Sequence, residues 1–269
     1  MSVENMAYVS FGGVRSDSTA LGLKMLSMPK RTKPQRQGKA VTIAGRSGDL
    51  FIDYGAYGTV SVKVDFMLTD LSKLSAVNQW LSGSGWLVLG DMPNRAYKAR
   101  CDKMLQYTPA TNHTTMQRIT IEWTCQPWMY VYPESATTTY NTSGQGQGTE
   151  VATIAAITNA FNAASAPIIE VVTDTSGMDF SLELYRGSEI APLWTIDFYG
   201  VPSTDIIIDG ELQDAVNADY TSYLNQYMDG EYPYFPVGTS TLKLSNVSKT
   251  GGETVNVTQI KITPRWRDI

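Results

Sequence analysis

The sequence predicts a mainly β protein with one helix, arranged as two domains. Residues 60–66 (VSVKVDF) alternate strictly between apolar and polar side chains, as a half-buried strand does. Residues 71–82 space their apolar side chains three to four apart, as a helix does. The second half of the chain places short apolar runs about 8–14 residues apart with glycines between them, which is typical of an antiparallel sandwich.

The segment before the first clear strand is basic. Residues 24–40 contain two prolines and show no apolar periodicity, so they predict a long loop or arm. The next run, 41–57 (VTIAGRSGDLFIDYGAY), predicts a strand, a tight turn and a second strand. Gly45 and Gly48 supply the backbone freedom that such a turn needs.

The predicted helix is about three turns long. Asp70 precedes it and is a good N-cap, because its carboxylate can accept a hydrogen bond from a free N–H of the first turn. Gly83 follows it and predicts its end. The apolar side chains of the predicted buried face are Leu71, Leu74, Val77 and Leu81.

The two cysteines lie on predicted adjacent antiparallel strands, residues 97–107 and 116–126. A hairpin centre near residue 112 places the thiols diagonally across this pair, near the limit of disulfide reach. We expect Cys101 and Cys125 to be reduced and buried, with a disulfide as the alternative.

A polar segment marks the predicted domain boundary. Residues 137–149 are rich in Thr, Gly and Gln and hold no apolar core former, which predicts a linker or an extended hairpin tip. We therefore expect an N-terminal domain of residues 1–136, a linker of 137–149 and a C-terminal domain of 150–269. Strands of the second domain are expected at 152–157, 167–172, 179–185, 193–198, 205–208, 221–227, 241–244 and 259–263.

Composition excludes several classes of protein. The 269 residues are 42% hydrophobic and 10% aromatic, as in a folded chain. No run of 18 apolar residues exists, so we expect no membrane insertion. The first residues lack the basic flank and apolar run of a signal peptide, so we expect synthesis in the cytoplasm.

Charge is unevenly distributed along the chain. Residues 24–46 hold seven basic residues and no acidic one, so the rest of the chain carries a net charge of −12 within the total of −5. A basic arm on an acidic body favours contact with an acidic surface, and a solvated loop is the alternative. Nucleic-acid binding is disfavoured, because the segment has no interleaved aromatic residues and the body would repel phosphate.

The sequence offers little for catalysis or metal binding. His113 is the only histidine, and no Gly-x-Ser-x-Gly motif supplies a partner serine. Residues 45–48 (GRSG) lack the lysine and the following helix of a phosphate loop, and residues 174–179 lack the closing glutamate of a calcium loop. Asp205 and Asp209 flank a predicted strand, where paired catalytic carboxylates are a minor alternative to solvated strand ends. We expect no catalytic residue, no cofactor and no metal.

Residues 219–235 form the most aromatic segment of the chain. Tyrosine rings beside Asp and Asn could stack on sugars, form a protein interface, or pair across the strands of a hairpin. The candidate contact residues are Tyr220, Tyr223, Tyr227, Tyr232 and Tyr234.

An ordered set of motifs runs through nearly the whole chain. After the 41–57 run come residues 80–89 (WLSGSGWLVL), 91–97 (DMPNRAY), 125–130 (CQPWMY) and 262–267 (ITPRWR). Together with residues 11–13 (FGG) and 21–23 (LGL), this set resembles the distal tail protein (Dit) family of long-tailed, non-contractile bacteriophages.

The resemblance implies a structural hub at the tail tip, with no enzymatic activity. It implies a homo-hexameric ring built from an N-terminal belt domain similar to tail-tube proteins, and a C-terminal galectin-like β-sandwich. The implied partners are the tail tube protein, the tail-associated hub protein and the receptor-binding or baseplate proteins, with DNA only passing through the lumen. The implied location is the virion tail tip, of a phage or a prophage.

Two further hypotheses accompany this resemblance. The basic residues could contact a neighbouring subunit; the candidates are Lys30, Arg31, Lys33, Arg36, Lys39 and Arg46. The alternative function is a carbohydrate-binding β-sandwich module acting in host surface adhesion, which leaves residues 1–130 unexplained. The sequence departs from the family pattern in its Gly/Gln-rich 137–149 segment, and no inserted carbohydrate-binding module is evident in the second half.

Overall fold

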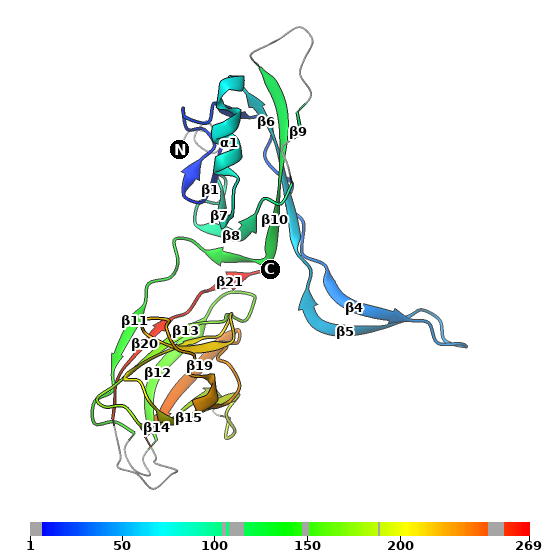
Figure 1. Cartoon of the computed structure of the whole chain (residues 1–269). Coiled ribbons are helices and arrows are strands. Elements are labelled where there is room, and N and C mark those ends of the chain that lie inside the picture. The colour runs from blue at the N-terminus through cyan, green and yellow to red at the C-terminus, as the bar shows by residue number, and fades with distance from the viewer. Residues whose placement is uncertain (1–6, 104–105, 108–115, 147–150, 188, 247–255) are drawn as a thin grey trace. The chain divides into compact units, whose positions relative to one another are not determined.

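The computed structural model describes residues 7–103, 106–107, 116–146, 151–187, 189–246 and 256–269. The chain divides into two units, Met1–Pro133 together with Ile269 (unit 1) and Glu134–Asp268 (unit 2), which Figure 1 shows in rainbow order. The predicted linker differs from what is observed, because strand β11 (Thr138–Asn141) lies inside it and pairs with β20 (Val257–Thr263). Tyr140 of β11 also packs against the core of unit 2, which explains why this polar segment is ordered there.

Unit 1 contains one antiparallel sheet with a helix against it. Seven strands follow the spatial order β2-β1-β7-β8-β10-β6-β3, and β9 also pairs with β10. The long strand β10 is central, because it pairs with both β6 and β8. The strands are β1 (Val9–Phe11), β2 (Val14–Arg15), β3 (Leu23–Met25), β6 (Val60–Leu68), β7 (Ser84–Leu89), β8 (Arg95–Arg100), β9 (Gln106–Tyr107) and β10 (Gln117–Val131).

The predicted helix is present, with a tighter first turn than expected. A 3₁₀ turn, η2 (Leu71–Lys73), leads into α1 (Leu74–Trp80). The predicted cap is confirmed, because Asp70 Oδ1 accepts a hydrogen bond of 2.9 Å from the Ser72 N–H. Gly83 follows with φ +83°. On the inner side Trp80 packs edge-on against Phe11 and Trp123, so the helix closes the core of unit 1.

The cysteine prediction is confirmed in part. Both thiols are free, and Cys125 is buried opposite Ala99. Burial raises the pKa of the Cys125 thiol to about 12. Cys101 is only half-buried, because β8 ends at Arg100 and the next residue leaves the ladder.

A separate two-stranded ribbon belongs to unit 1. Strand β4 (Arg36–Val41) pairs with β5 (Leu50–Tyr57), and no third strand joins them among the described residues. The loop predicted for residues 24–40 is therefore wrong at its end, where residues 36–40 are strand. This basic segment has no apolar periodicity that would indicate a strand, but pairing with β5 makes residues 36–40 a strand.

Unit 2 is a sandwich of two antiparallel five-stranded sheets. One sheet has the order β11-β20-β13-β16-β17 and the other the order β12-β19-β14-β15-β18. The mainly β fold class with one helix is thus confirmed. The remaining elements are β12 (Ala152–Asn159), β13 (Ile168–Thr173), β14 (Met178–Arg186), β15 (Trp194–Val201), β16 (Asp205–Asp209), β17 (Asp214–Asn217), η3 (Asn225–Tyr227), β18 (Met228–Gly230), β19 (Gly238–Ser245) and β21 (Arg267–Asp268).

The strand predicted for residues 221–227 is wrong. The Asn217 side chain accepts hydrogen bonds from the N–H groups of Thr221 and Ser222, which holds a tight loop instead. Asn225 Oδ1 accepts from the Ala215 N–H at 2.6 Å and begins the 3₁₀ turn η3. Local side-chain to backbone bonds thus replace the strand ladder.

Candidate interaction surfaces

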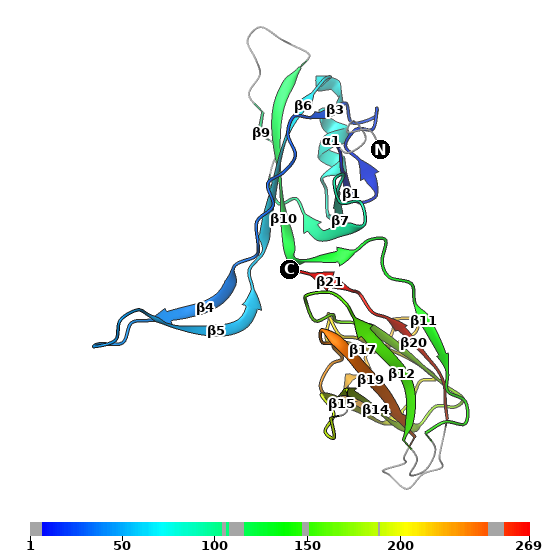
Figure 2. The ribbon, with the colours of Figure 1, turned by 180° about the vertical axis from the view of Figure 1, so that it is seen from behind.

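The β4–β5 ribbon exposes large apolar side chains. No residue of β5 is buried, and the exposed fractions reach 52% for Phe51 and 61% for Tyr54. Figures 1 and 2 show the ribbon from opposite sides, with no helix or other strand along it. A two-stranded ribbon is marginally stable at best in water, and exposed apolar patches mark interaction sites.

The two faces of the ribbon differ in chemistry. Val41 lies opposite Leu50 and Lys39 opposite Ile52, so these four share one face, which is mostly apolar. On the other face, Phe51 lies over Gly38; a Cβ placed on Gly38 would be only 2.4 Å from the ring Cζ. Glycine is required there because the aromatic ring occupies the space of its side chain.

The six basic residues proposed for a subunit interface are all exposed, but they are not equivalent. Arg31 makes a 2.5 Å ion pair with Asp91 of its own chain. Arg36 pairs with Asp53 and also donates to the Tyr57 hydroxyl at 3.2 Å, and both partners raise the pKa of its guanidinium, the hydroxyl most. The other four basic residues form no ion pair with any described residue; they are Lys30, Lys33, Lys39 and Arg46.

The five candidate tyrosines do not form one surface. Tyr220 and Tyr223 are 68% and 71% exposed, and Tyr220 has a left-handed backbone with φ +55°. Tyr227, Tyr232 and Tyr234 pack partly against the sandwich core. Only the first two remain available as exposed aromatic contacts.

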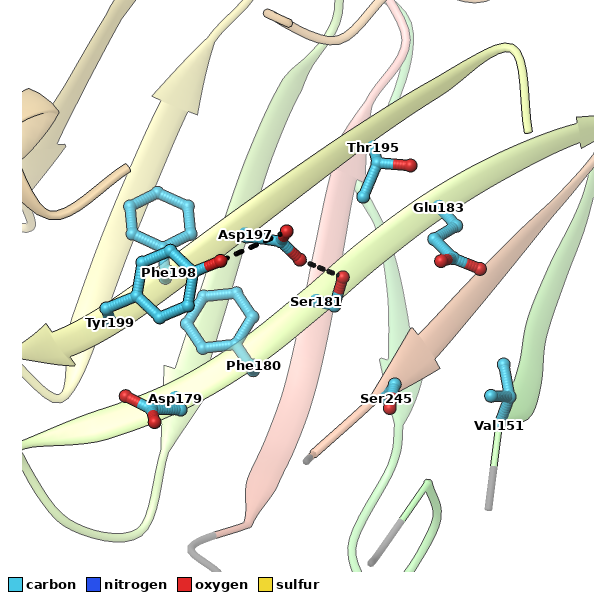
Figure 3. A pocket seen from close by; sticks show the side chains of 10 residues that line it. All are labelled: Val151, Asp179, Phe180, Ser181, Glu183, Thr195, Asp197, Phe198, Tyr199 and Ser245. Carbon is cyan, nitrogen blue, oxygen red and sulfur yellow. Dashed lines mark hydrogen bonds between the residues drawn. The ribbon is translucent and has the colours of Figure 1, made fainter. Parts of the chain in front are cut away.

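A polar cavity lies on the outer face of the β14–β15 pair (Figure 3). Its volume is about 280 Å³. The Asp197 carboxylate accepts hydrogen bonds from the Ser181 hydroxyl and, at 3.3 Å, from the Tyr199 hydroxyl. Glu183 also lines the cavity and accepts a 2.6 Å bond from Tyr185, which raises the pKa of that phenol to about 12. The sequence alone did not indicate this site, because Ser245 of its lining comes from β19, which lies far along the chain from β14 and β15.

The other candidates for chemistry have structural partners or lie outside the described residues. His113 is outside them. Residues 45–48 form the turn of the β4–β5 ribbon, where the Arg46 N–H donates to Ile43 O at 3.1 Å. Asp174 Oδ1 accepts from the Asn256 N–H. Asp209 is held by a bidentate pair with Arg265 at 2.7 and 2.9 Å.

No group of three or more His, Cys, Asp or Glu side chains in the described part of the chain is arranged to hold a metal ion. None of its helices has the length and apolar character needed to cross a bilayer.

Comparison with known proteins gives a structural match. No protein-family model and no curated protein matches the sequence. The crystal structure of the Dit protein (gp 19.1) of phage SPP1, described as a paradigm of the hub adsorption apparatus in phages that infect Gram-positive bacteria, is similar with a TM-score of 0.62. The match covers 95% of this chain and 96% of that one at 16% sequence identity.

Two baseplate structures are more distant. The phage P2 baseplate in its activated conformation with Ca has a TM-score of 0.41 at 10% identity, and the form with Sr has 0.40 at 8%. Each match covers 90% of both chains. The SPP1 match alone carries the conclusion that this chain has the fold of a distal tail protein, from its belt-like sheet to its sandwich.

Proposed function

We propose that this protein is a structural hub of a phage or prophage tail tip, without enzymatic activity. In this proposal, unit 1 forms a ring, expected to be a hexamer, that joins the tail tube to the baseplate or receptor-binding apparatus. Unit 2 is a galectin-like sandwich that meets the other baseplate proteins, and DNA passes through the lumen of the ring. Nearly full-length likeness in fold to the SPP1 Dit protein supports this assignment.

The main observation in favour of ring formation is the exposed apolar face of the β4–β5 ribbon. Its apolar face would be stabilised if it packed against the next copy of unit 1. Contacts between identical subunits in a ring are heterologous, so a projecting element on one side and a receiving surface on the other suit this symmetry.

The charge distribution also supports a second copy of this chain as the partner of the ribbon. Lys30, Lys33, Lys39 and Arg46 have no carboxylate partner within the described part of their own chain. Outside residues 24–46, the chain carries a net charge of −12, so a second copy offers an acidic surface. An acidic body also suits a lumen for DNA, since it would not retain phosphates.

Light scattering on the full chain, with negative-stain images of the same peak, tests the ring. A mass near six times 29.6 kDa and images with an open centre are expected. A monomer at every concentration measured would contradict assembly by this chain alone.

A matched pair of substitutions tests the role of the ribbon. Ile52→Ser on the ribbon should shift the peak toward monomer, because it removes apolar surface from the docking face. Ile190→Ser is the control, because Ile190 is 98% exposed in unit 2 and the same change should leave the ring intact. Equal behaviour of the two variants would exclude the ribbon as the ring contact.

Charge reversal tests the basic residues separately. Replacing Lys30, Lys33 and Lys39 with Glu should weaken the ring. Added salt should weaken assembly of the wild type, because it screens the attraction, and should restore part of the assembly of the variant, because it screens the repulsion. Arg31 is left unchanged, because its pair with Asp91 is internal. Unaltered assembly of the triple variant would remove these lysines from the interface.

A further inference from the structure

We propose that residues 26–33 of one copy dock on a tyrosine-bearing edge of unit 2 in another copy. This edge is the side of the sandwich where β17 and β18, the end strands of the two sheets, are joined by residues 218–227. The inference rests on the self-assembly proposed above and names the surface that receives the basic segment. The contact joins two copies, so it does not depend on how the two units of one chain are arranged.

Two tyrosines on this edge are exposed in a loop that is already fixed. Tyr220 and Tyr223 are 68% and 71% exposed. Asn217 holds the loop, because its Oδ1 accepts hydrogen bonds of 2.9 and 3.0 Å from the N–H groups of Thr221 and Ser222. A partner can therefore bind both rings without the cost of ordering the loop first, and tyrosine is among the residues enriched at protein interfaces.

The same edge is acidic. Residues 187–242 hold nine acidic residues and no basic one. On the edge, Asp219, Asp229 and Glu231 are exposed, and none of them forms an ion pair with a described residue. Carboxylates together with tyrosine rings favour a partner that carries lysine or arginine, through ion pairs and through contacts of the cation with a ring face.

Residues 26–33 have the complementary surface. Leu26 and Met28 are 47% and 38% exposed, so this segment offers apolar contact for the two rings. A methionine thioether also packs favourably against aromatic rings. Lys30 and Lys33 are exposed and form no ion pair with any described residue, so their charges are available to the acidic edge.

The carboxylates of unit 1 are a poorer match for these lysines. Six of the described ones already pair with a basic residue of the same unit; they are Asp17, Asp53, Asp65, Asp91, Asp102 and Glu122. Of the other two, Asp70 caps the helix and Asp49 accepts from the Thr42 hydroxyl. Among the described residues, carboxylates without a cation are therefore concentrated on unit 2, which favours this edge as the receiving surface.

Zero-length cross-linking of the full chain tests the docking surface. Unlabelled and isotope-labelled copies are mixed until native mass spectrometry shows mixed assemblies, and a carbodiimide then joins lysine amines to carboxylates. Links between Lys30 or Lys33 of one label and Asp219, Asp229 or Glu231 of the other are expected. Links from these lysines to other carboxylates only, or only within one label, would overturn the proposal.

Exchange of charge between the two surfaces tests the pairing itself. Asp219→Lys with Glu231→Lys should raise the concentration needed for half-assembly about tenfold, because attraction becomes repulsion. Adding Lys30→Glu with Lys33→Glu to the same chain should bring it back to within about threefold of the wild type, because opposite charges meet again. Failure of this rescue in folded variants would place the acidic partner elsewhere. Hydrogen exchange in β17 and β18 checks folding.

Asp174→Lys with Glu189→Lys is the matched control. Both side chains are exposed on unit 2 outside the β17–β18 edge, and the change in net charge is the same. This control should neither weaken assembly nor rescue the lysine variant, and equal behaviour of the two pairs would show a diffuse charge effect instead of a docking surface.

The outcomes separate this inference from the ring. Assembly of the wild type that survives the edge substitutions unchanged would overturn the docking surface and leave the ring proposal standing. The expected cross-links in an assembly of another size would support the docking surface and contradict the ring. A chain that stays monomeric at every concentration measured would overturn both.

Discussion

The β4–β5 ribbon and the β14–β15 pair contain similar strands that meet very different surroundings. Both are antiparallel pairs rich in aromatic and branched side chains. In β14–β15 the inward side chains are buried, with Phe198 at 0% exposure stacked on Phe180 at 4.9 Å. In β4–β5 both faces are exposed. The difference shows that a strand pattern specifies pairing within a chain, while burial depends on what covers the pair.

Stability and assembly therefore depend on different parts of the molecule. In unit 2 the two sheets cover each other's apolar faces, so the stability of unit 2 comes from contacts within a single chain. The ribbon leaves its apolar surface uncovered in a single chain, so its contribution must come from a second copy if the ring proposal holds.

Matched phenylalanine substitutions should give the largest contrast. Phe198→Ala should destabilise unit 2 by about 3–5 kcal/mol, because it leaves a cavity in a packed core. Phe51→Ala should change the stability of the isolated chain by about 0.5 kcal/mol or less, because the ring is half-exposed. Hydrogen exchange followed by mass spectrometry on the full chain would report each unit separately. Similar destabilisation by the two changes would show that the ribbon is covered within one chain.

The sandwich also contains a nearly buried charged pair, whereas the charged pair of the ribbon, Arg36 with Asp53, is exposed. Arg265 makes a bidentate pair with Asp209, and both side chains are nearly buried. Burial alone would raise the pKa of Asp209, but the bonds from Arg265 and from two backbone N–H groups leave it below its ordinary value of 3.8.

Removing this pair should have the second largest effect. Arg265→Met should cost about 3 kcal/mol, because it leaves Asp209 buried without its cation. In the wild type, a depressed carboxylate pKa stabilises the fold above about pH 4 and the contribution is lost as pH falls through the lowered value. Urea denaturation between pH 2 and 7 would measure both effects. The exposed pair of Arg36 and Asp53 is the comparison, since Arg36→Met should leave the free energy of unfolding nearly unchanged.

Much of the fold follows from local sequence signals. The alternation in β6 and β10 and the cap at Asp70 act within a few residues, so they predicted strands and a helix correctly. The predictions for residues 36–40 and 221–227 failed because each segment depends on a specific partner that apolar periodicity does not reveal. β4 is ordered by pairing with β5, and the loop by the side chain of Asn217.

The candidate sites were harder to predict than the fold. The basic residues and exposed tyrosines could be found by composition, but their internal partners could not. The polar cavity needs Ser181, Asp197 and Ser245 from three strands, and the chain order gives no signal that β14 lies between β15 and β19. Only the polar alternation in residues 179–185 and 195–199 hinted that this face carries polar groups.

The smallest effect on unfolding, and the sharpest test of the ribbon, is expected at Gly38. Gly38→Ala brings a Cβ within 2.5 Å of the Ile52 carbonyl oxygen and 2.4 Å of the Phe51 ring, so Phe51 and the β4 backbone must shift. The chain outside the ribbon should keep its stability within about 0.5 kcal/mol, because the added Cβ meets Phe51 and Ile52 of the ribbon itself. Amides of residues 36–41 and 50–57 should exchange faster, and assembly measured by light scattering should weaken.

Gly58→Ala is the control for this substitution, because a Cβ at Gly58 would meet its nearest neighbour, Gln35 O, only at 3.7 Å. It should leave both exchange and assembly near the wild type. If Gly38→Ala loosens the ribbon while assembly stays intact, the ribbon would be a free appendage, and the difference between the two regions would lie in packing alone. If both change together, the uncovered strands of unit 1 are the part of the chain that needs a second copy.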